Sequence, residues 1–443
     1  MRKIAFLLLT LALPALSGAL EKQPLAVYHA RRQALAEKAG AAVLMFAAVE
    51  QGESLYGFRQ DNNFYYLTGW TEPGAALLIL PAQKSSAANE TARAYTEILF
   101  LPAHNLIREK YTGPKLTADN PQAARLAGVD RVEALDKLRD LLAEVLPRGE
   151  LPAPAPKLYA DLAADDAESP ATLPLTWLRG ANAFGRVSMQ DVKPLVKALR
   201  MVKDAGEMEF IRKAVAASDE AHKAALKAMK PGINEREISA LMQYEFEKRG
   251  CERPAYAPIV GSGPFSTVLH YDADDRQMQP GEVVVMDVGG EYSMYAADIT
   301  RTLAVSGKFS ARQREIYEIV LGAQQAAERA FVAGKSMMTG MADNSLFRAA
   351  YDYINTHGKD SHGQPLGKYF VHGLGHHVGL EVHDAGDYTV PLDKGNVFTL
   401  EPGIYIPEEN LGVRIEDMYW VDASGKLVKL SADLPSGVDE VQK

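Results

Sequence analysis

Apolar and polar residues alternate along residues 20–190 with two different periods, one typical of helices and one typical of buried strands. The pattern predicts a helix from Ala26 to Lys38. It also predicts short strands at Ala42 to Ala48, Ala75 to Pro81 and Glu97 to Pro102, and an amphipathic helix from Arg131 to Leu146. Helices that alternate with strands in this way favour an α/β domain.

A long helical pattern opens the second half of the chain. It runs from about Lys203 to Met229 and ends at Lys230-Pro231-Gly232, residues of the kind that commonly stop a helix. We expect a domain boundary near Ser188 to Pro194, with one domain over residues 20–190 and another over residues 195–440. A chain of 443 residues is long enough for two globular domains, each with its own core.

The first 19 residues have the pattern of a secretory signal peptide. Arg2-Lys3 form a basic start, Ile4 to Leu16 form an apolar core, and Ser17-Gly18-Ala19 supply the small residues that precede a cleavage site. The apolar core is too short to span a bilayer, and no other stretch is apolar enough to do so. We therefore predict cleavage after Ala19 and a periplasmic or secreted protein, with an uncleaved anchor as the alternative.

Composition excludes some classes of function. The net charge of −9 argues against nucleic acid as a partner. Cys251 is the only cysteine, so no disulfide can form within the chain. A structural zinc site built from several cysteines is excluded for the same reason.

Two aspartates lie in apolar runs that we expect to form the arms of a hairpin. Val283 to Met286 leads into Asp287, and the run from Ala297 to Val305 carries Asp298. With a turn near Tyr292-Ser293, the two carboxylates would face each other on one side of the sheet, with Cβ atoms about 4.5–5.5 Å apart.

The same pattern recurs near the C-terminus. Glu401 follows the run Val397 to Leu400, and a turn near Glu408-Glu409 would place it opposite Glu416. Acidic residues on strands usually face solvent, but these lie next to buried strand, where an unpaired carboxylate is costly. Carboxylates this close together repel unless a cation lies between them. The two acidic pairs therefore predict a metal centre.

Four of the ten histidines fall in the segment from His372 to His383. Its glycines, Gly373 and Gly375, do not have the spacing of a nucleotide-binding loop. We expect them to let the backbone pass close to a ligand. A histidine from this cluster, next to the four carboxylates, is a candidate metal ligand.

In their order along the chain, these motifs resemble the Xaa-Pro aminopeptidase and prolidase branch of the pita-bread metallopeptidases. The matching stretches cover about residues 195–440 and are Ile259 to Gly263, Leu269-His270-Tyr271, Met286 to Gly289, Ala297 to Thr302, His372 to His376, Glu401 to Tyr405 and Val413 to Asp417. Arg59 to Gly69 resemble the family's N-terminal domain. The resemblance implies a creatinase-like α/β domain followed by a pita-bread catalytic domain.

The resemblance also implies the ligands of two divalent metal ions, which are Asp287, Asp298, His376, Glu401 and Glu416. Glu416 would bridge the two ions together with either Asp298 or Asp287. The oxygen-rich set suits Mn²⁺, with Zn²⁺ and Co²⁺ as alternatives. Two such ions would lower the pKa of a shared water and polarise the scissile carbonyl.

Further roles carry over from the family to matching residues. Glu401 would accept a proton from the attacking water, and His270 and His383 would contact the substrate carbonyl and the developing oxyanion. The other active-site residues implied are His372, Arg414 as a clamp behind the ligands, and Tyr405 as a hydroxyl near the substrate. We do not include His377, which lies beside a ligand, in the site.

Asp61 is the candidate for binding the free amine of the substrate. In relatives, an acidic residue of this segment can reach the active site of a neighbouring subunit, which implies a dimer or tetramer. The alternative is that Asp61 only caps the turn before a strand.

Substrate length separates the candidate functions. An Xaa-Pro dipeptidase (prolidase) commonly has an arginine between the residues that correspond to His383 and Glu401, but this interval contains only Lys394. We therefore expect an exported Xaa-Pro aminopeptidase, which releases the first residue from peptides with proline second. A prolidase is the alternative. A pita-bread protein that binds peptides without hydrolysis is disfavoured, because all five ligands are present.

Overall fold

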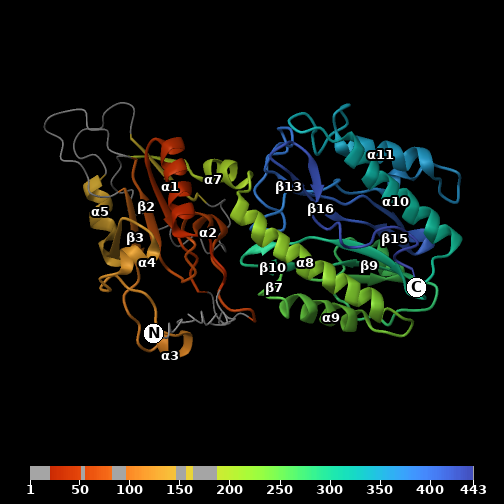
Figure 1. Cartoon of the computed structure of the whole chain (residues 1–443), viewed down its shortest axis with the longest axis horizontal. Coiled ribbons are helices and arrows are strands. Elements are labelled where there is room, and N and C mark those ends of the chain that lie inside the picture. The colour runs from red at the N-terminus through yellow and green to blue at the C-terminus, as the bar shows by residue number, and fades with distance from the viewer. Residues whose placement is uncertain (1–19, 51–54, 82–95, 146–155, 163–186, 443) are drawn as a thin grey trace, which may run out of the picture.

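The computed structural model describes residues 20–50, 55–81, 96–145, 156–162 and 187–442. These residues form two domains that lie side by side, one from the N-terminal part of the chain and one from the C-terminal part (Figure 1). Both domains mix helices with strands, as the sequence predicts. The predicted signal peptide, residues 1–19, lies outside the described residues. Among those described, no helix is both long and apolar enough to cross a membrane.

A six-stranded sheet organises the described part of the N-terminal domain, in the order β4-β3-β2-β1-β5-β6. Its strands are β1 (Ala42–Phe46), β2 (Ala76–Ile79), β3 (Glu97–Leu101), β4 (Arg131–Ala134), β5 (Lys157–Ala160) and β6 (Ser188–Asp191). The β1–β2 and β2–β3 pairs are antiparallel, and the other pairs are parallel. Successive residues of β1 point to opposite faces, so Val43 and Met45 pack in one core cluster and Leu44 packs in another.

Helices cover both faces of this sheet. The helices α1 (Leu25–Ala39) and α2 (Asn62–Thr68) lie on one side, and α5 (Leu138–Val145) lies on the other (Figure 1). The short helices α3 (Glu109–Thr112) and α4 (Ala123–Ala127) belong to the same domain. Two layers of helix around one sheet agree with the α/β class predicted for this part of the chain.

The predicted elements of the N-terminal domain are confirmed except for one. The helix expected at Ala26 to Lys38 is α1, and the three expected strands are β1, β2 and β3. The helix expected at Arg131 to Leu146 is wrong in its first half, because Arg131–Ala134 pairs in parallel with β3. Only Leu138–Val145 is α-helical. The exposed backbone edge of β3 outweighs the helical pattern of these four residues.

The predicted boundary region, Ser188 to Pro194, contains the last strand of the sheet, β6. The chain therefore leaves the N-terminal sheet after Asp191 and continues in α7 (Lys193–Arg200). The long predicted helix is α8 (Ala205–Ala228). It begins two residues later than expected, at a capping box formed by Asp204 and Glu207.

Two pairs of helices enclose the strands of the C-terminal domain. The helix α8 packs with α9 (Glu235–Glu247) on one side, and α10 (Ala311–Ala330) packs with α11 (Leu346–His357) on the other (Figure 1). Between them, the described residues form sheets with the orders β12-β9-β8, β11-β10-β7, β13-β16-β17 and β14-β15. The resemblance to pita-bread metallopeptidases predicts this layout.

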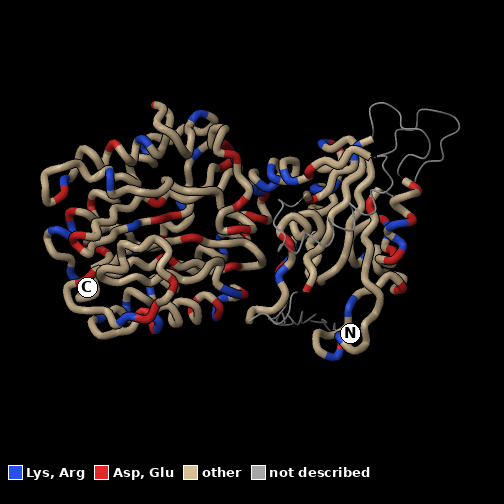
Figure 2. The backbone as a smooth tube through the Cα atoms, turned by 180° about the vertical axis from the view of Figure 1, so that it is seen from behind, with Lys and Arg blue, Asp and Glu red and all other residues tan. Residues whose placement is uncertain are grey.

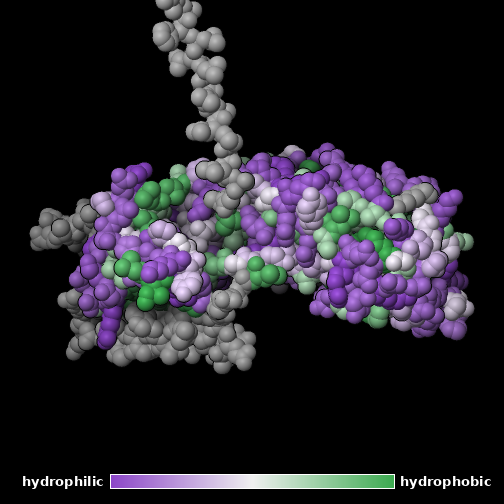
Figure 3. Space-filling model, turned by 90° about the horizontal axis from the view of Figure 1, so that it is seen from below, coloured by the Kyte–Doolittle hydropathy of each residue, from purple (hydrophilic) through white to green (hydrophobic). Residues whose placement is uncertain are grey.

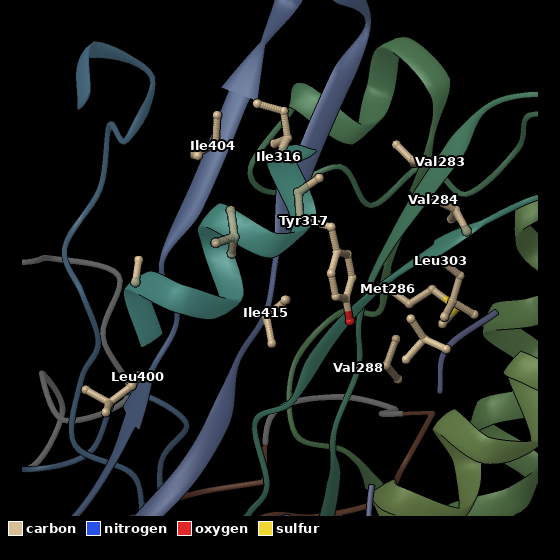
Figure 4. Close-up of a cluster of buried hydrophobic side chains, with 14 of the residues drawn as sticks. Val283, Val284, Met286, Val288, Leu303, Ile316, Tyr317, Leu400, Ile404 and Ile415 are labelled. Atoms are coloured by element: carbon tan, nitrogen blue, oxygen red, sulfur yellow. The ribbon is translucent and has the colours of Figure 1, made fainter. Parts of the chain in front are cut away.

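The strands of these sheets are short. They are β7 (Arg253–Pro254), β8 (Ile259–Ser262), β9 (Val283–Asp287), β10 (Gly290–Tyr292), β11 (Tyr295–Ala296), β12 (Thr300–Ala304), β13 (Val397–Leu400), β14 (Gly403–Ile406), β15 (Leu411–Arg414), β16 (Asp417–Val421) and β17 (Leu427–Lys429). Apolar side chains of β9 and β12 meet those of α10 in a large core (Figure 4). Because β9 is buried over its whole length, the acidic residue at its end, Asp287, is held at the interior.

The described residues on the face seen from below are mostly hydrophilic (Figure 3). Lysine and arginine are interspersed with aspartate and glutamate along the backbone of both domains (Figure 2). Seen from below, hydrophobic surface is divided into separate patches (Figure 3). A group of acidic residues is buried instead, and most of them belong to the C-terminal domain. Buried acids are costly unless they are paired, so they point to the functional site.

Candidate metal centre

The strands β9 and β12 bring the two aspartates to one face of a sheet. Asp287 ends β9, and Asp298 lies just before β12. The turn between them falls at Ser293-Met294, one residue later than predicted, and both turn residues have a positive φ (49° and 74°). Asp287 consequently pairs with Thr300 and not, as predicted, with Asp298. Asp298 is its diagonal neighbour on the same face, close enough for both carboxylates to reach one point.

The two glutamates have the predicted relation. The strand pairs β13–β16 and β14–β15 share one register, in which Glu401 lies opposite Glu416. The turn between β14 and β15 falls at Pro407–Glu409, as predicted. The backbone of Glu416 also exchanges hydrogen bonds with that of Thr300 at 3.1 and 3.4 Å. The glutamate hairpin is thereby joined to the aspartate hairpin.

His376 lies on a segment without regular secondary structure that runs beside β13. Its N–H donates to the Thr399 hydroxyl (3.2 Å), and its C=O accepts from the Thr399 N–H (2.9 Å). A Cβ at Gly375 would lie 2.0 Å from the Thr399 carbonyl oxygen, whereas a Cβ at Gly373 would meet nothing within 4 Å. Gly375 therefore admits the neighbouring strand. Both glycines also line the cavity of the site, and close contact of their backbone with a ligand stays a prediction.

Asp298, His376 and Glu416 form the centre of the site. Each offers one ligand atom, and these atoms all lie within 4.8 Å of one another. The Nε2 atom of His376 lies 3.2 Å from Oδ2 of Asp298 and 3.5 Å from Oε1 of Glu401. Asp287 and Glu401 line the same cavity, which has a volume of about 560 Å³. The structure thus brings together all five residues of the predicted ligand set.

Burial and repulsion make the two glutamates of the site harder to ionise. Burial raises the pKa of Glu401 to about 7. Burial also raises the pKa of Glu416 well above its usual value, and repulsion from Asp298 and Glu401 adds to the effect. For Asp298, burial alone would raise the pKa, but the hydrogen bond with His376 lowers it below the usual range. A divalent cation among these groups would relieve their repulsion.

Asp287 is held from both sides. The Tyr256 hydroxyl donates to its Oδ1 atom and the Arg414 guanidinium donates to its Oδ2 atom, each over 2.6 Å. Burial raises the pKa of Asp287, and Arg414 opposes that effect. Arg414 also donates to the Tyr405 hydroxyl (3.0 Å), so it forms a clamp of the kind that the resemblance implies. Tyr256 could not be found from the sequence, because it stands in an irregular segment without any pattern that marks a site.

Among the described residues, only one of the two carboxylate oxygens of Glu416 has a hydrogen-bond partner. The Thr300 hydroxyl donates to its Oε2 atom (2.8 Å). Its Oε1 atom is buried and has no hydrogen-bond partner among the described residues. A buried carboxylate oxygen without a partner is costly. A metal ion would satisfy it, and a set of carboxylates with one imidazole suits a hard or borderline divalent ion.

Three further histidines, His270, His372 and His383, line the same cavity. The His383 ring packs against His376 with 3.9 Å between the ring centroids. Burial lowers the pKa of His372 to about 4, so its ring is neutral. Its Nδ1–H donates to the Gly373 C=O (2.8 Å), and its Nε2 then accepts from the Tyr405 hydroxyl (2.9 Å). His377, which sequence analysis excluded, is buried outside the cavity lining.

Asp61 lies apart from these residues. It caps α2, where its Oδ1 atom accepts from the Phe64 N–H (2.8 Å). The element that follows is this helix and not the expected strand. Asp61 lines another cavity, of about 650 Å³, to which both domains contribute residues. Capping is the contact that a single chain shows, and contact with a substrate amine stays a prediction.

Comparison with known proteins places this site in a family. The model of metallopeptidase family M24 matches residues 209–423, and the model of the aminopeptidase P N-terminal domain matches residues 28–151. The Xaa-Pro aminopeptidase of Escherichia coli (strain K12) is 32% identical over a match that covers 94% of this chain and 96% of that protein. The Xaa-Pro dipeptidase of Pyrococcus furiosus is 40% identical over 250 residues, which cover 55% of this chain and 67% of that protein.

A solved structure shows a similar fold over both domains. Proline aminopeptidase P II from Yersinia pestis superposes with a TM-score of 0.79 at 29% identity, over 95% of this chain and 98% of that one. Both domains are therefore shared in sequence and in fold. The chain belongs to metallopeptidase family M24, in the branch of the aminopeptidases P and prolidases.

Proposed function

We propose that this metallo-aminopeptidase removes the first residue from peptides that carry proline in the second position. The observation that carries the proposal is one cavity that combines the five acidic and imidazole ligands with His270, His372 and His383. Similarity to an Xaa-Pro aminopeptidase over nearly the whole chain supports the same substrate class.

Two divalent metal ions would be held by Asp287, Asp298, His376, Glu401 and Glu416. These residues fit such ions, because three of them converge and the buried Oε1 atom of Glu416 has no partner in the described part of the chain. The oxygen-rich set favours Mn²⁺, with Zn²⁺ and Co²⁺ as alternatives. When bound, the ions would lower the pKa of the attacking water and polarise the scissile carbonyl.

The protein groups around the site have separate tasks. Glu401 lines the cavity and accepts the proton of the attacking water. His270 and His383 reach the cavity from two different loops and donate hydrogen bonds to the oxygen that becomes negative during attack. Arg414 holds Asp287 and orients the Tyr405 hydroxyl, which in turn fixes His372.

The cations near the cavity support aminopeptidase over dipeptidase activity. Among the described residues that line it, Arg414 is the only lysine or arginine, and it already pairs with Asp287 at 2.6 Å. Lys394, the candidate from the sequence, lies near Gly425 and does not line the cavity. A bound dipeptide would place its carboxylate here without a free cationic partner, whereas a longer peptide places its carboxylate farther away. Similarity to an Xaa-Pro dipeptidase makes prolidase activity the second candidate.

The test compares Ala-Pro with Ala-Pro-Ala as substrates of full-length protein that is stripped with a chelator and reloaded with Mn²⁺, Zn²⁺ or Co²⁺. Cleavage of the tripeptide before proline, with slow cleavage of the dipeptide, is expected. Preference for the dipeptide would make the protein a prolidase. No cleavage of either peptide by metal-loaded protein would contradict a peptidase function.

We also propose that the protein is exported, on the basis of the basic, apolar and small-residue regions of residues 1–19. Protein recovered from the periplasmic or secreted fraction should begin at Leu20 when its N-terminus is sequenced. A chain that begins at Met1 and stays in the cytosolic fraction would contradict export.

A further inference from the structure

His270 enters the cavity from a loop and not from a helix or strand. The loop leaves β8, forms a short 3₁₀ helix at Gly263–Thr267 and continues through residues 268–276 without regular structure. Within the described part of the chain, no hydrogen bond holds the His270 ring. The position of the ring therefore depends on the backbone that carries it.

Glu235, at the start of α9, holds both ends of this loop. Its Oε1 atom accepts from the N–H (2.8 Å) and the hydroxyl (2.7 Å) of Ser262, where the loop begins. Its Oε2 atom accepts from the N–H of Arg276 (2.9 Å), where the loop ends. The residue is 0% exposed. A carboxylate buried this deeply requires full hydrogen bonding, and Glu235 obtains it from the loop itself.

Tyr271, directly after His270, connects the middle of the loop to the same carboxylate. Its hydroxyl donates to Oε2 of Glu235 over 2.9 Å and lies 3.2 Å from Oδ1 of Asp275. Its ring stacks on Phe265, with centroids 4.5 Å apart and 5° between the planes. Because Tyr271 and His270 are adjacent, fixing Tyr271 restricts the backbone from which His270 reaches the cavity.

The conformation of the loop is an unfavourable one. Asp274 has a positive φ of 44°, which is uncommon for a residue other than glycine. Its Oδ1 atom accepts from the Val260 N–H (2.9 Å), so β8 holds this residue in place. Unfavourable backbone that the surrounding structure maintains is typical of functional sites.

We propose that Glu235 is a positioning residue for His270 and acts through Tyr271. Glu235 does not line the cavity, so it has no contact with a peptide bound there. It fixes the loop at its beginning, middle and end, and this holds the His270 imidazole where the oxyanion develops. The inference rests on the proposed peptidase function, because that function assigns the oxyanion contact to His270.

Tyr271→Phe tests this link, because it removes one hydroxyl and leaves the ring stacked on Phe265. Tyr317→Phe is the matched control, since its buried hydroxyl donates to the Ser436 C=O (3.0 Å) and lies outside the cavity lining. Metal-loaded Tyr271→Phe should lose about tenfold in kcat with little change in KM, because the oxyanion contact acts in the transition state. Tyr317→Phe should keep the wild-type kcat. The Tm of Tyr317→Phe and the Tm of Tyr271→Phe should fall by a similar small amount. Equal kcat in the two variants would overturn the proposal.

The His270→Ala background separates positioning from general stability. His270→Ala alone should lose about a hundredfold in kcat. Adding Tyr271→Phe should then cost less than about twofold more, because the group being positioned is already absent. A further tenfold loss in that background would show that Tyr271 acts elsewhere, against the proposal. Glu235→Gln keeps the size of the side chain. It should change kcat as Tyr271→Phe does, both in the otherwise wild-type protein and in His270→Ala.

Hydrogen exchange of residues 263–276 in metal-free protein does not depend on activity. This segment should exchange faster in Tyr271→Phe than in Tyr317→Phe, and equal exchange would overturn the proposal. If the wild-type protein cleaved no proline-containing peptide, the proposed function would fail. The exchange measurement would still decide whether Glu235 and Tyr271 hold the loop.

Discussion

Single side chains outside the proposed ligand set hold the proposed ligands in place, and Tyr256 is one of them. Its hydroxyl donates to one oxygen of Asp287 over 2.6 Å, while Arg414 occupies the other oxygen. Tyr256→Phe removes this bond without opening space, so the carboxylate should rotate more freely. We expect the affinity for Mn²⁺ to fall by about tenfold in calorimetric titration of chelator-stripped protein. Tyr317→Phe should keep the wild-type affinity, and equal affinity of both variants would leave Tyr256 without this role.

Glu401 is the single residue on which hydrolysis should depend most. Glu401→Ala removes a residue that we propose both as a metal ligand and as the proton acceptor, so kcat should fall by about a thousandfold or more. The circular dichroism spectrum should stay unchanged, because the side chain opens on a cavity. Glu408→Ala, at an exposed acid of the same hairpin, is the control and should keep full activity. Turnover at the wild-type rate in Glu401→Ala would remove Glu401 from the mechanism.

At the level of elements, the strands that carry the four acidic residues of the proposed ligand set could be predicted because each is an apolar run next to an acid. The register of the first hairpin could not be predicted as accurately. Its turn uses Ser293 and Met294 at positive φ, where glycine or asparagine would have given a signal. Glu252 holds this turn by accepting from the Ser293 N–H at 2.8 and 3.0 Å, across 41 positions of sequence. A shift of one residue in the turn moves the register by two, which separates Asp287 from Asp298.

Other parts of the site and fold depend on contacts that no local pattern records. Tyr256 meets Asp287 across 31 positions of sequence, and a single tyrosine in an irregular segment has no periodicity to mark it. Residues Arg131–Ala134 form a strand because the edge of β3 is available, although their own pattern continues into the following helix. The spacing of residues in the sequence could predict which side chains share one hairpin. It could not predict which side chains from different elements contact each other.

The loop that carries His383 is held by a buried network of charges. Asp384 accepts from Lys203 (2.7 Å) and from Arg200, and Arg200 also donates to Asn63 of α2 (2.7 Å). Burial alone would raise the pKa of Asp384, but Lys203 and Arg200 lower it below the usual range. The contribution of this network to stability is therefore present above the pKa of an unfolded aspartate, and it is lost as the pH falls through the lower folded value.

Asp384→Asn should test the strength of this network. It leaves two buried cations facing a neutral amide, so the free energy of unfolding in urea should fall by about 3–5 kcal/mol. Adding Lys203→Met should recover part of that loss, because it removes one of the unpaired charges. A loss below about 1 kcal/mol in Asp384→Asn would instead place the network among weak, solvated ion pairs.

At the level of the whole molecule, the role of Asp61 depends on assembly. In its own chain it caps α2 and lines the cavity between the domains, and we expect contact with a substrate amine to come through a neighbouring subunit. We predict a dimer or tetramer in sedimentation experiments and a raised KM for free-amine peptides in Asp61→Ala. Asp61→Asn should also raise KM, although asparagine caps helices as well as aspartate does. Unchanged kinetics in both variants would leave Asp61 with capping alone.

The two domains should unfold together, because buried ion pairs cross between them. Arg31 of α1 lies 3.3 Å from Glu207 of α8, and both side chains are buried. Unfolding one domain alone would break this pair, as well as the link from Asn63 through Arg200 to Asp384. Calorimetry of metal-loaded protein should therefore show one transition. Chelation should lower its Tm as a whole, because the metal ions bind only the folded protein. Two transitions, with only one shifted by the chelator, would mean that each domain is stable by itself.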